Sequence, residues 1–226
     1  MKKKHWMAGA AVLVDDRPFE VTRFVLQQTA VNTPKDWKIL WYHAPSWKPA
    51  YQKAFLNDCR PELRSRLELR PAPWDRINVA RYNSLCKDPK WWAEIPAEHI
   101  LVFQLDGCPL TASMHHVQEF LDYDYVGAPW IDGHLKGKVG NGGFSLRRKS
   151  AMLKCLKERP PTEEDIEDVY FGSKCADLIK VAPYEIARRF SVESEHKYPI
   201  PLGFHKADKR VSRPHCPEID HLKAFY

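Results

Sequence analysis

Residues 99–110, HILVFQLDGCPL, decide the fold of this chain. Four apolar residues, 100–103, follow one another without a polar break, and a glycine and a proline close the run. This pattern predicts a strand buried on both faces, as in an α/β sheet. Ligands of such sheets bind beyond the carboxyl ends of the strands, where Gln104 and Asp106 lie. Their i, i+2 spacing predicts that both side chains point to the same side.

The chemistry of these two residues suggests a ligand. A carboxylate at Asp106 suits a hard divalent cation, and the amide of Gln104 suits a hydroxyl-rich ligand. The alternative is an aspartate that only caps the next turn.

The first half of the chain alternates between expected strands and helices. Strands are expected at 10–14, 37–42 and 67–69, and helices at 20–31, at 49–59, from an N-cap at Asp75 through 86, and from 88–89 onward. This alternation predicts an α/β fold with a mainly parallel sheet and helices on both faces.

The second half has a different pattern. Strands are expected at 125–128 and 144–147, and helices at 149–158, 165–178 and 183–190. The last thirty or so residues are rich in Pro and His and show little periodicity. Without an internal repeat or a low-complexity linker, the 226 residues are predicted to form a single domain.

Composition limits the classes of function. A hydrophobic content of 44% and a charged content of 28% are those of a globular protein that can bury a core. The net charge of +6 favours an anionic ligand such as a phosphate ester. No basic stripe with interleaved aromatic residues indicates a nucleic-acid partner.

Cysteine spacing and hydropathy indicate the compartment. The six cysteines form no CxxC motif, which excludes a zinc knuckle, and reduced thiols in a cytoplasmic protein are expected. No apolar run is long enough to span a bilayer, and residues 7–14 are interpreted as a strand rather than a signal peptide. A peripheral membrane contact through residues 2–4 or the basic tail stays open.

A glycine-rich segment, GKVGNGGFSL at 137–146, matches neither a Walker A loop nor GxGxxG. Its glycines would let the backbone approach a ligand closely. The alternative is a hairpin turn, since Asn-Gly is a strong turn signal.

An acidic segment, EEDIEDVY at 163–170, follows. On a helix, Glu164 and Asp168 share one face, as do Asp165 and Asp168. A helix N-terminus explains the first acids of the run but not Glu167 and Asp168, which are about a turn further in. A carboxylate held there in a cleft can act as a general base. Further along, His205 could bind a metal or titrate near neutrality, or it could be an ordinary surface histidine.

Taken in order, these pieces resemble a GT-A glycosyltransferase. QLD at 104–106 looks like its DxD motif with Gln in the first place, GNGG at 140–143 like its glycine loop, 166–168 like its xED motif, and His205 like its C-terminal histidine. Four longer segments resemble an uncharacterised glycosyltransferase-like family of bacterial, fungal and viral reading frames: YDYVGAPW (123–130), GNGGFSLR (140–147), EDVYF (167–171) and PLGFHK (201–206). The likeness runs from about Ala10 to Lys206.

The resemblance implies a GT-A-like (Rossmann-like) mixed sheet. It also implies a nucleotide-binding half at about 8–110, an acceptor and catalytic half at about 111–206, and a basic tail at 207–226. The implied activity is inverting, metal-dependent transfer of a sugar from a nucleotide-sugar donor to a hydroxyl of a glycan, lipid or small molecule.

The resemblance also implies roles for single residues. Asp106 and His205 would bind Mn²⁺ or Mg²⁺, which bridges the diphosphate and stabilises the leaving nucleoside diphosphate. Gln104 would bond the ribose hydroxyls. Asp168 would deprotonate the acceptor hydroxyl, and Glu167 would help to bind the acceptor or orient the base. Asp15, Arg17 and Asn83 would hold the nucleoside, and Trp130, Asn141, Gly142 and Gly143 would contact the donor sugar or the acceptor.

Two other functions stay open. A nucleotidyltransferase also uses a carboxylate-bound metal, but it needs a glycine-rich first strand-to-helix turn, and VDDRPFE at 14–20 has no glycine. A non-catalytic sugar- or nucleotide-binding protein is favoured only by Gln104, which removes one charge from the expected metal site.

Overall fold

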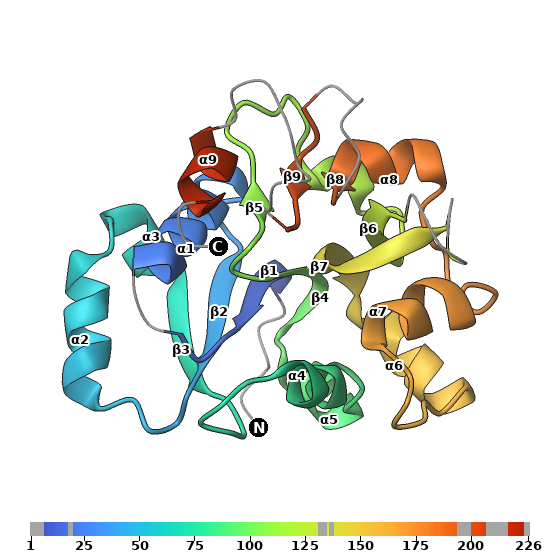
Figure 1. Cartoon of the computed structure of the whole chain (residues 1–226), viewed down its shortest axis with the longest axis horizontal. Helices are drawn as coiled ribbons and strands as arrows, with labels where there is room; N and C mark the ends of the chain where they lie inside the picture. Colours follow the sequence, from blue (N-terminus) through green and yellow to red (C-terminus); the bar gives the residue numbers. More distant parts are fainter. Residues whose placement is uncertain are drawn as a thin grey trace.

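Strand β1 (Met7–Val14) lies inside a six-stranded sheet with the order β3-β2-β1-β4-β7-β6 (Figure 1). It pairs in parallel with both of its neighbours, β2 (Lys38–His43) and β4 (Ala97–Phe103). At one edge, β3 (Leu67–Pro71) continues the parallel pairing. The expected mainly parallel sheet is therefore confirmed, and its parallel strands end at one common edge.

The other side of the sheet is antiparallel. Strand β7 (Val139–Arg148) pairs antiparallel with β4 and also with β6 (Tyr125–Pro129). Because β7 runs the opposite way, its first residues lie beside the carboxyl end of β4. The backbone N–H of Gln104 donates to the carbonyl of Gly143 at 2.9 Å, which joins the two segments at that edge.

The computed structural model describes residues 7–17, 20–130, 135, 138–193, 200–206 and 217–223. Residues 2–4 and most of the basic tail, for which a membrane contact was an option, lie outside this part. None of the helices in the described part has the length and apolar character needed to cross a bilayer.

Each face of the sheet is covered by helices, as expected. The central residues of β1 and β4 have no exposed surface, and successive side chains point to opposite faces of the sheet. A hydrophobic core therefore lies on each face. One face is covered by α1 (Glu20–Asn32), α3 (Pro61–Arg66), α8 (Tyr184–Phe190) and α9 (Pro217–Lys223). The other is covered by α4 (Val79–Cys86), α5 (Pro89–Glu94) and α6 (Lys149–Glu158).

A second, small sheet brings the C-terminal segment to the main one. It has the order β5-β9-β8, made of β5 (Cys108–Pro109), β9 (Gly203–Phe204) and β8 (Ser191–Val192). Cys108 pairs with Phe204, so the residue after β9, His205, is held beside the turn that follows β4. Strands of two residues carry no periodicity, which is why the sequence did not predict them.

The structure of the glycine-rich segment differs from the predicted loop or hairpin turn. The expected strand at 144–147 is confirmed as part of β7, but residues 139–143 are also part of this strand and form neither a loop nor a hairpin turn. Glycine suits this strand because neighbouring backbone lies very close. A Cβ on Gly127 of β6 would lie 2.2 Å from the carbonyl oxygen of Asn141.

Helix boundaries differ at several places. Helix α4 is capped by Asn78, whose side chain accepts from the N–H of Arg81, and not by Asp75, which accepts from the N–H of Ser46. The helix expected at 49–59 is α2 (Pro49–Asp58), and a further helix that was not expected, α3, begins at Pro61, because proline is tolerated in a first helical turn. Pro183 caps α8 and is not its first residue. A 3-10 turn, η1 (Val117–Phe120), was not expected.

The acidic helix expected at 165–178 is much shorter. It consists of α7 (Glu167–Val169), which continues as a π-helical turn, η3 (Tyr170–Lys174). Asp165 lies before the helix and accepts from the N–H of Thr162 at 2.7 Å. Glu164 and Asp165 therefore do not share a helix face with Asp168.

Candidate active site

A cleft of about 660 Å³ opens at the common edge where the parallel strands end. Its walls come from segments that are far apart in the chain. The polar and charged residues among them are Asp15, Arg17, Asn78, Tyr82, Asn83, Gln104, Asp106, Asn141, Glu167, Asp168, His205 and Lys206. Its size lies in the range of about 300–1,000 Å³ that is typical of small-molecule sites.

Gln104 and Asp106 lie in a turn directly after β4. The N–H of Gly107 donates to the carbonyl of Gln104 at 3.2 Å, so the chain is not extended here, contrary to expectation. The two side chains nevertheless converge on one atom. Nε2 of His205 lies 3.1 Å from Oε1 of Gln104 and 3.3 Å from Oδ1 of Asp106.

His205 is a buried residue with acidic groups at both ring nitrogens, not a surface histidine. Its Nδ1 lies 3.5 Å from Oε1 of Glu193. Burial alone would lower the pKa of His205, but hydrogen bonds to Asp106 and Glu193 and their charges outweigh it and raise the pKa to about 9. In the absence of a metal, the imidazole is a cation at neutral pH.

Glu193 was missed by the sequence analysis. It accepts from Nδ2 of Asn141 at 2.9 Å and forms an ion pair with Lys206. Burial tends to raise the pKa of Glu193, but hydrogen bonds from His205 and Lys206 lower it on balance. The segment around Glu193 has no regular pattern, so nothing in the sequence indicated this carboxylate. Asn141 therefore connects β7 to the histidine through Glu193.

Glu167 forms a buried ion pair with Arg147 of β7. The two guanidinium nitrogens of Arg147 contact the two carboxylate oxygens at 2.5 and 3.1 Å, and both side chains are almost fully buried. Burial raises the pKa of Glu167, and the charge of Arg147 opposes this effect. Arg147 was not predicted as a site residue, since the partners are 20 residues apart with no motif between them.

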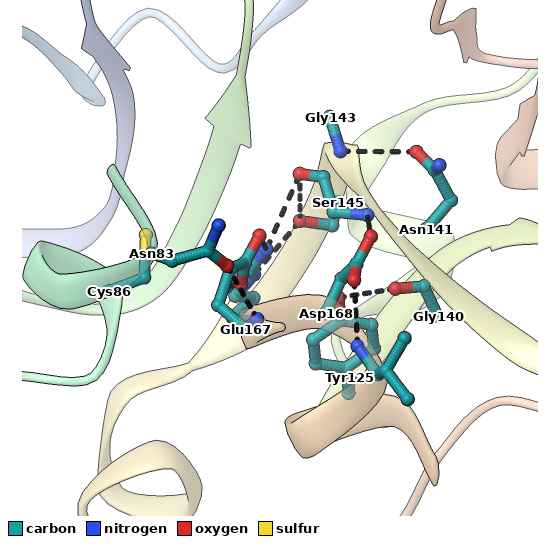
Figure 2. A network of polar contacts seen from close by, with 12 residues as sticks. Asn83, Cys86, Tyr125, Gly140, Asn141, Gly143, Ser145, Glu167 and Asp168 are labelled. Atoms are coloured by element: carbon teal, nitrogen blue, oxygen red, sulfur yellow. Dashed lines mark hydrogen bonds and ion pairs between the residues drawn. The ribbon is translucent and has the colours of Figure 1, made fainter. Parts of the chain in front are cut away.

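Asp168 lies next to this pair and lines the cleft (Figure 2). Its Oδ2 accepts from the N–H of Gly142 at 3.1 Å, and its Oδ1 accepts from the N–H of Val169 at 2.7 Å. Two backbone donors thus fix the orientation of the carboxylate, while the residue stays partly exposed to the cleft.

Asn83 holds the start of α7 in place (Figure 2). Its Oδ1 accepts from the N–H of Glu167 at 2.7 Å, and its Nδ2 donates to the carbonyl of Val79 at 2.8 Å. Asn83 does line the cleft, as a nucleoside contact requires. Its hydrogen bonds, however, give it a part in positioning Glu167 and Asp168.

Gly142 and Gly143 make room for side chains of the site itself. A Cβ on Gly142 would lie 2.3 Å from Oε1 of Glu167, and one on Gly143 would lie 2.0 Å from Nε2 of His205. The two glycines therefore allow α7 and His205 to pack against β7.

Asp15 and Arg17 follow β1 at the same edge of the sheet. The Asp15 carboxylate accepts from the backbone N–H of Arg17 at 2.8 Å and pairs with its guanidinium at 2.8 Å. Burial raises the pKa of Asp15, and the Arg17 contacts oppose this effect. The pair places a cation at the cleft wall.

Trp130 is not among the residues that line this cleft. Its ring lies beside Gly140, where an added Cβ would be 3.1 Å away. The structure therefore does not bring the expected sugar-stacking residue to the other candidate residues.

The side chains around Nε2 of His205 are the candidate ligands for Mn²⁺ or Mg²⁺. Within the described residues, no group of three or more His, Cys, Asp and Glu side chains is arranged to hold a metal. Asp106, His205 and the amide oxygen of Gln104 do converge at one point of the cleft. These ions commonly take one or two carboxylates and complete their coordination with water and substrate phosphates. The residues therefore fit such an ion, provided that Nε2 of His205 loses its proton.

Comparison with protein families gives one match. A model of the family described as "Protein of unknown function (DUF5672)" matches residues 66–205, which is more than half of the chain and includes most of the site. No curated protein sequence matches.

Comparison with solved structures shows the GT-A fold. The galactosyltransferase LgtC, solved with donor and acceptor sugar analogs, is 12% identical with a TM-score of 0.54, over 96% of this chain and 95% of that one. The mannosyltransferase PcManGT from Pyrobaculum calidifontis, solved with GDP-Man and Mn²⁺, is 10% identical with a TM-score of 0.57, over 91% of this chain and 59% of that one. The bifunctional glycosyltransferase WbbM is 8% identical with a TM-score of 0.55, over 90% of this chain. The chain spans only 46% of WbbM.

Proposed function

The chain belongs to the family described as protein of unknown function DUF5672, and we propose that it is a metal-dependent glycosyltransferase. It would transfer a sugar from a nucleotide-sugar donor to an acceptor hydroxyl. One observation carries the proposal. Asp106, His205 and Asp168, which are far apart in sequence, line one cleft at the carboxyl edge of the parallel strands of a GT-A sheet.

The donor half of the cleft suits a nucleoside diphosphate. Asp106 and His205, with Gln104 beside them, would hold Mn²⁺ or Mg²⁺. The bound ion would act as a Lewis acid that stabilises the charge on the leaving diphosphate. Arg17 and Lys206 add cationic groups to the same wall. Asp15 orients Arg17, and Asn83 or the Gln104 amide would bond the nucleoside hydroxyls.

Asp168 is the base in this proposal. The acceptor oxygen attacks the anomeric carbon and loses its proton to the Asp168 carboxylate. The bond between the anomeric carbon and the phosphate oxygen breaks, and its electron pair stays on the nucleoside diphosphate. Attack from the face opposite the leaving group gives inversion. Backbone donors to both oxygens of Asp168 hold it in one orientation, which such a proton transfer requires.

Glu167 has a positioning role in this scheme. Its carboxylate is engaged by Arg147 and is almost fully buried, so we assign it to the placement of Asp168 rather than to acceptor binding. Gly142 and Gly143 support the same arrangement. The ligands named for two structures of the same fold, GDP-Man and Mn²⁺ for PcManGT and donor and acceptor sugar analogs for LgtC, support a nucleotide-sugar donor and a divalent metal.

A thermal-shift panel tests the donor half. Nucleoside diphosphates and nucleotide sugars are added with Mn²⁺ or with EDTA to the wild type, Asp106→Asn, Asp168→Asn and the exposed control Asp122→Asn. A ligand that binds the native state raises Tm. We expect a Mn²⁺-dependent shift for one nucleotide that Asp106→Asn removes and that Asp168→Asn and Asp122→Asn retain. The absence of a shift with any nucleotide would contradict the proposal.

A product assay tests the chemistry. With the nucleotide sugar from the panel, Asp168→Asn should lower turnover by about 10²–10⁴-fold. NMR of the anomeric proton during the first turnovers should show the inverted configuration. Release of pyrophosphate from a nucleoside triphosphate would instead indicate a nucleotidyltransferase, and binding without turnover in the wild type would indicate a non-catalytic protein.

A further inference from the structure

A second cavity, of about 740 Å³, lies next to the cleft on the other side of Ile166. Asn83 and Ile166 line both cavities, so the two share a wall. The second cavity is formed between the end of α4 with the start of α5 and the segment 161–166. We call it the acid-lined pocket. Ile166 lies two residues before the proposed base, Asp168, so the wall shared by the two cavities is next to that base in the chain.

One lysine fixes the outer wall of the acid-lined pocket. Nζ of Lys87 donates to three backbone carbonyls, those of Thr162 at 2.8 Å, Glu163 at 3.2 Å and Asp165 at 2.8 Å. The three donors of the ammonium group are therefore used to hold the wall, and its positive charge remains. The Asp165 carboxylate is likewise engaged, by Lys174 at 2.8 Å. These bonds give the pocket a preformed shape.

The charge that remains in the acid-lined pocket is negative. Glu163 and Glu164 are exposed on its rim, and the structure gives neither carboxylate an ion-pair partner among the described residues. Asp88, whose side chain caps α5, adds a third carboxylate. The cleft on the other side of Ile166 carries Arg17, His205 and Lys206. That cleft also holds the carboxylates of Asp15, Asp106, Glu167 and Asp168. The acid-lined pocket, with four carboxylates and one lysine, therefore carries the larger excess of negative charge.

Ile166 gives the boundary between the two cavities an apolar surface. Ile166 is 57% exposed and is one of five exposed large apolar residues in the described part of the chain. An exposed aliphatic side chain of this kind packs well against the C–H face of a sugar ring. The contact removes apolar surface of both partners from water, which favours binding. The ionised carboxylates on the rim can only accept hydrogen bonds, so the groups of a sugar that they can bind are hydroxyl and ammonium groups.

We propose that the acid-lined pocket binds the acceptor and selects a sugar without negative charge, with an amino sugar preferred. The proposal rests on the proposed function, since it takes Asp168 as the group that receives the acceptor proton. Like charges repel and opposite charges attract across a few ångströms, so the rim carboxylates favour a protonated amine and disfavour a carboxylate or a phosphate. The nucleotide, which is anionic, is disfavoured in the acid-lined pocket by the same rule.

Three trisaccharides with different charges test the proposal at pH 6.5 and low salt. Binding to the full chain is measured by NMR for the glucosamine trimer, which is cationic, cellotriose, which is neutral, and trigalacturonate, which is anionic. We expect the cationic probe to bind about tenfold more tightly than the neutral one, and the anionic probe to bind most weakly. The differences should shrink with added salt.

Charge variants test whether the rim carboxylates of the pocket cause the ranking of the three affinities. Glu163→Gln/Glu164→Gln should reduce the differences, and Glu163→Lys/Glu164→Lys should reverse the order. The matched control Glu62→Lys/Glu185→Lys makes the same change of net charge at exposed positions outside the pocket and should keep the wild-type order. The same order in all variants, or no binding of any probe, would overturn the proposal.

The nucleotide panel separates this proposal from the proposed function. If the rim variants alter the order of the trisaccharides and keep the Mn²⁺-dependent nucleotide shift, both are supported. If the wild type shows the order but binds no nucleotide, the pocket is a sugar site and the transferase assignment fails. If nucleotide binding is intact and the trisaccharides bind without regard to charge, the acceptor proposal alone fails.

Discussion

The carboxylate of Glu193 lies 3.5 Å from Nδ1 of His205, while Gln104 and Asp106 contact Nε2 of the same imidazole. A histidine that presents one nitrogen to a cleft is commonly oriented through the other nitrogen by a carboxylate. Asn141 fixes Glu193 in turn. The relationship makes Glu193 a positioning residue for the candidate metal ligand.

Replacement of Glu193 should change the titration of His205. Glu193→Gln keeps the shape of the side chain but removes its charge, so the pKa of His205 should fall from about 9 toward the ordinary value of 6.5. NMR of the imidazole protons in EDTA measures it. Glu185→Gln, at an exposed glutamate of α8, is the control and should leave the pKa of His205 unchanged. An unchanged pKa in Glu193→Gln would assign the upward shift to Asp106 alone.

Stability should depend on pH through the same histidine. Because the folded pKa of His205 lies above its unfolded value, its contribution is complete below about pH 6.5 and is lost as the pH rises to about 9. A shift of this size corresponds to about 3 kcal/mol of the free energy of unfolding. Urea denaturation in EDTA from pH 6 to pH 9.5 should show this decline in the wild type. A decline of the same size in His205→Gln would show that another group causes it.

The Arg147–Glu167 pair should be important for stability. Arg147→Met leaves the Glu167 carboxylate buried without its partner and should lower the free energy of unfolding by about 3–5 kcal/mol. The double variant Arg147→Met/Glu167→Met should recover much of that loss. Arg23→Met, which breaks a more exposed pair with Asp58, should cost about 1 kcal/mol or less. Equal losses in the single and double variants would show that the pair is not coupled.

The sequence predicted the parts of the fold that depend on local patterns. The continuous apolar runs of β1, β2 and β4 predict strands buried on both faces, and that is where the structure places them. The first part of β7, residues 139–143, could not be predicted as a strand, because glycines carry no hydrophobic pattern. The strand forms through pairing with β4 and β6, and its glycines are required by the side chains packed against them.

The residues of the candidate site also divide into those that local motifs predict and those that only the fold brings together. Gln104, Asp106, Asp168 and His205 were singled out from short motifs, and the structure brings all four to one cleft, although their roles stay predictions. Glu193 was missed because it follows β8, a strand of only two residues that has no periodicity in the sequence. Arg147 was missed because its partner is defined by the fold and not by spacing in the sequence.

Gly143→Ala should disturb His205 directly. The new Cβ would lie 2.0 Å from Nε2, so the imidazole has to move and the free energy of unfolding should fall by about 1–3 kcal/mol. Mn²⁺ affinity should fall with it. In a His205→Ala background the space is free, so the same glycine substitution should cost less. Urea denaturation of the four proteins of this cycle measures the coupling, and additive losses would show that the two positions do not interact.

Gln104→Asp should strengthen metal binding. Oε1 of Gln104 reaches the same nitrogen of His205 as Asp106 does, so an aspartate there adds a second carboxylate to the candidate metal site, on a side chain shorter by one carbon. Affinity for hard cations rises with the number of charged ligands. We expect the Kd for Mn²⁺, measured by electron paramagnetic resonance at pH 7, to fall about tenfold, which corresponds to ~1.4 kcal/mol. Gln118→Asp, which adds the same charge at an exposed position of η1, should leave the Kd unchanged. Equal affinities in the wild type and Gln104→Asp would mean that position 104 does not reach the metal, and would favour the ribose hydroxyls as its partners.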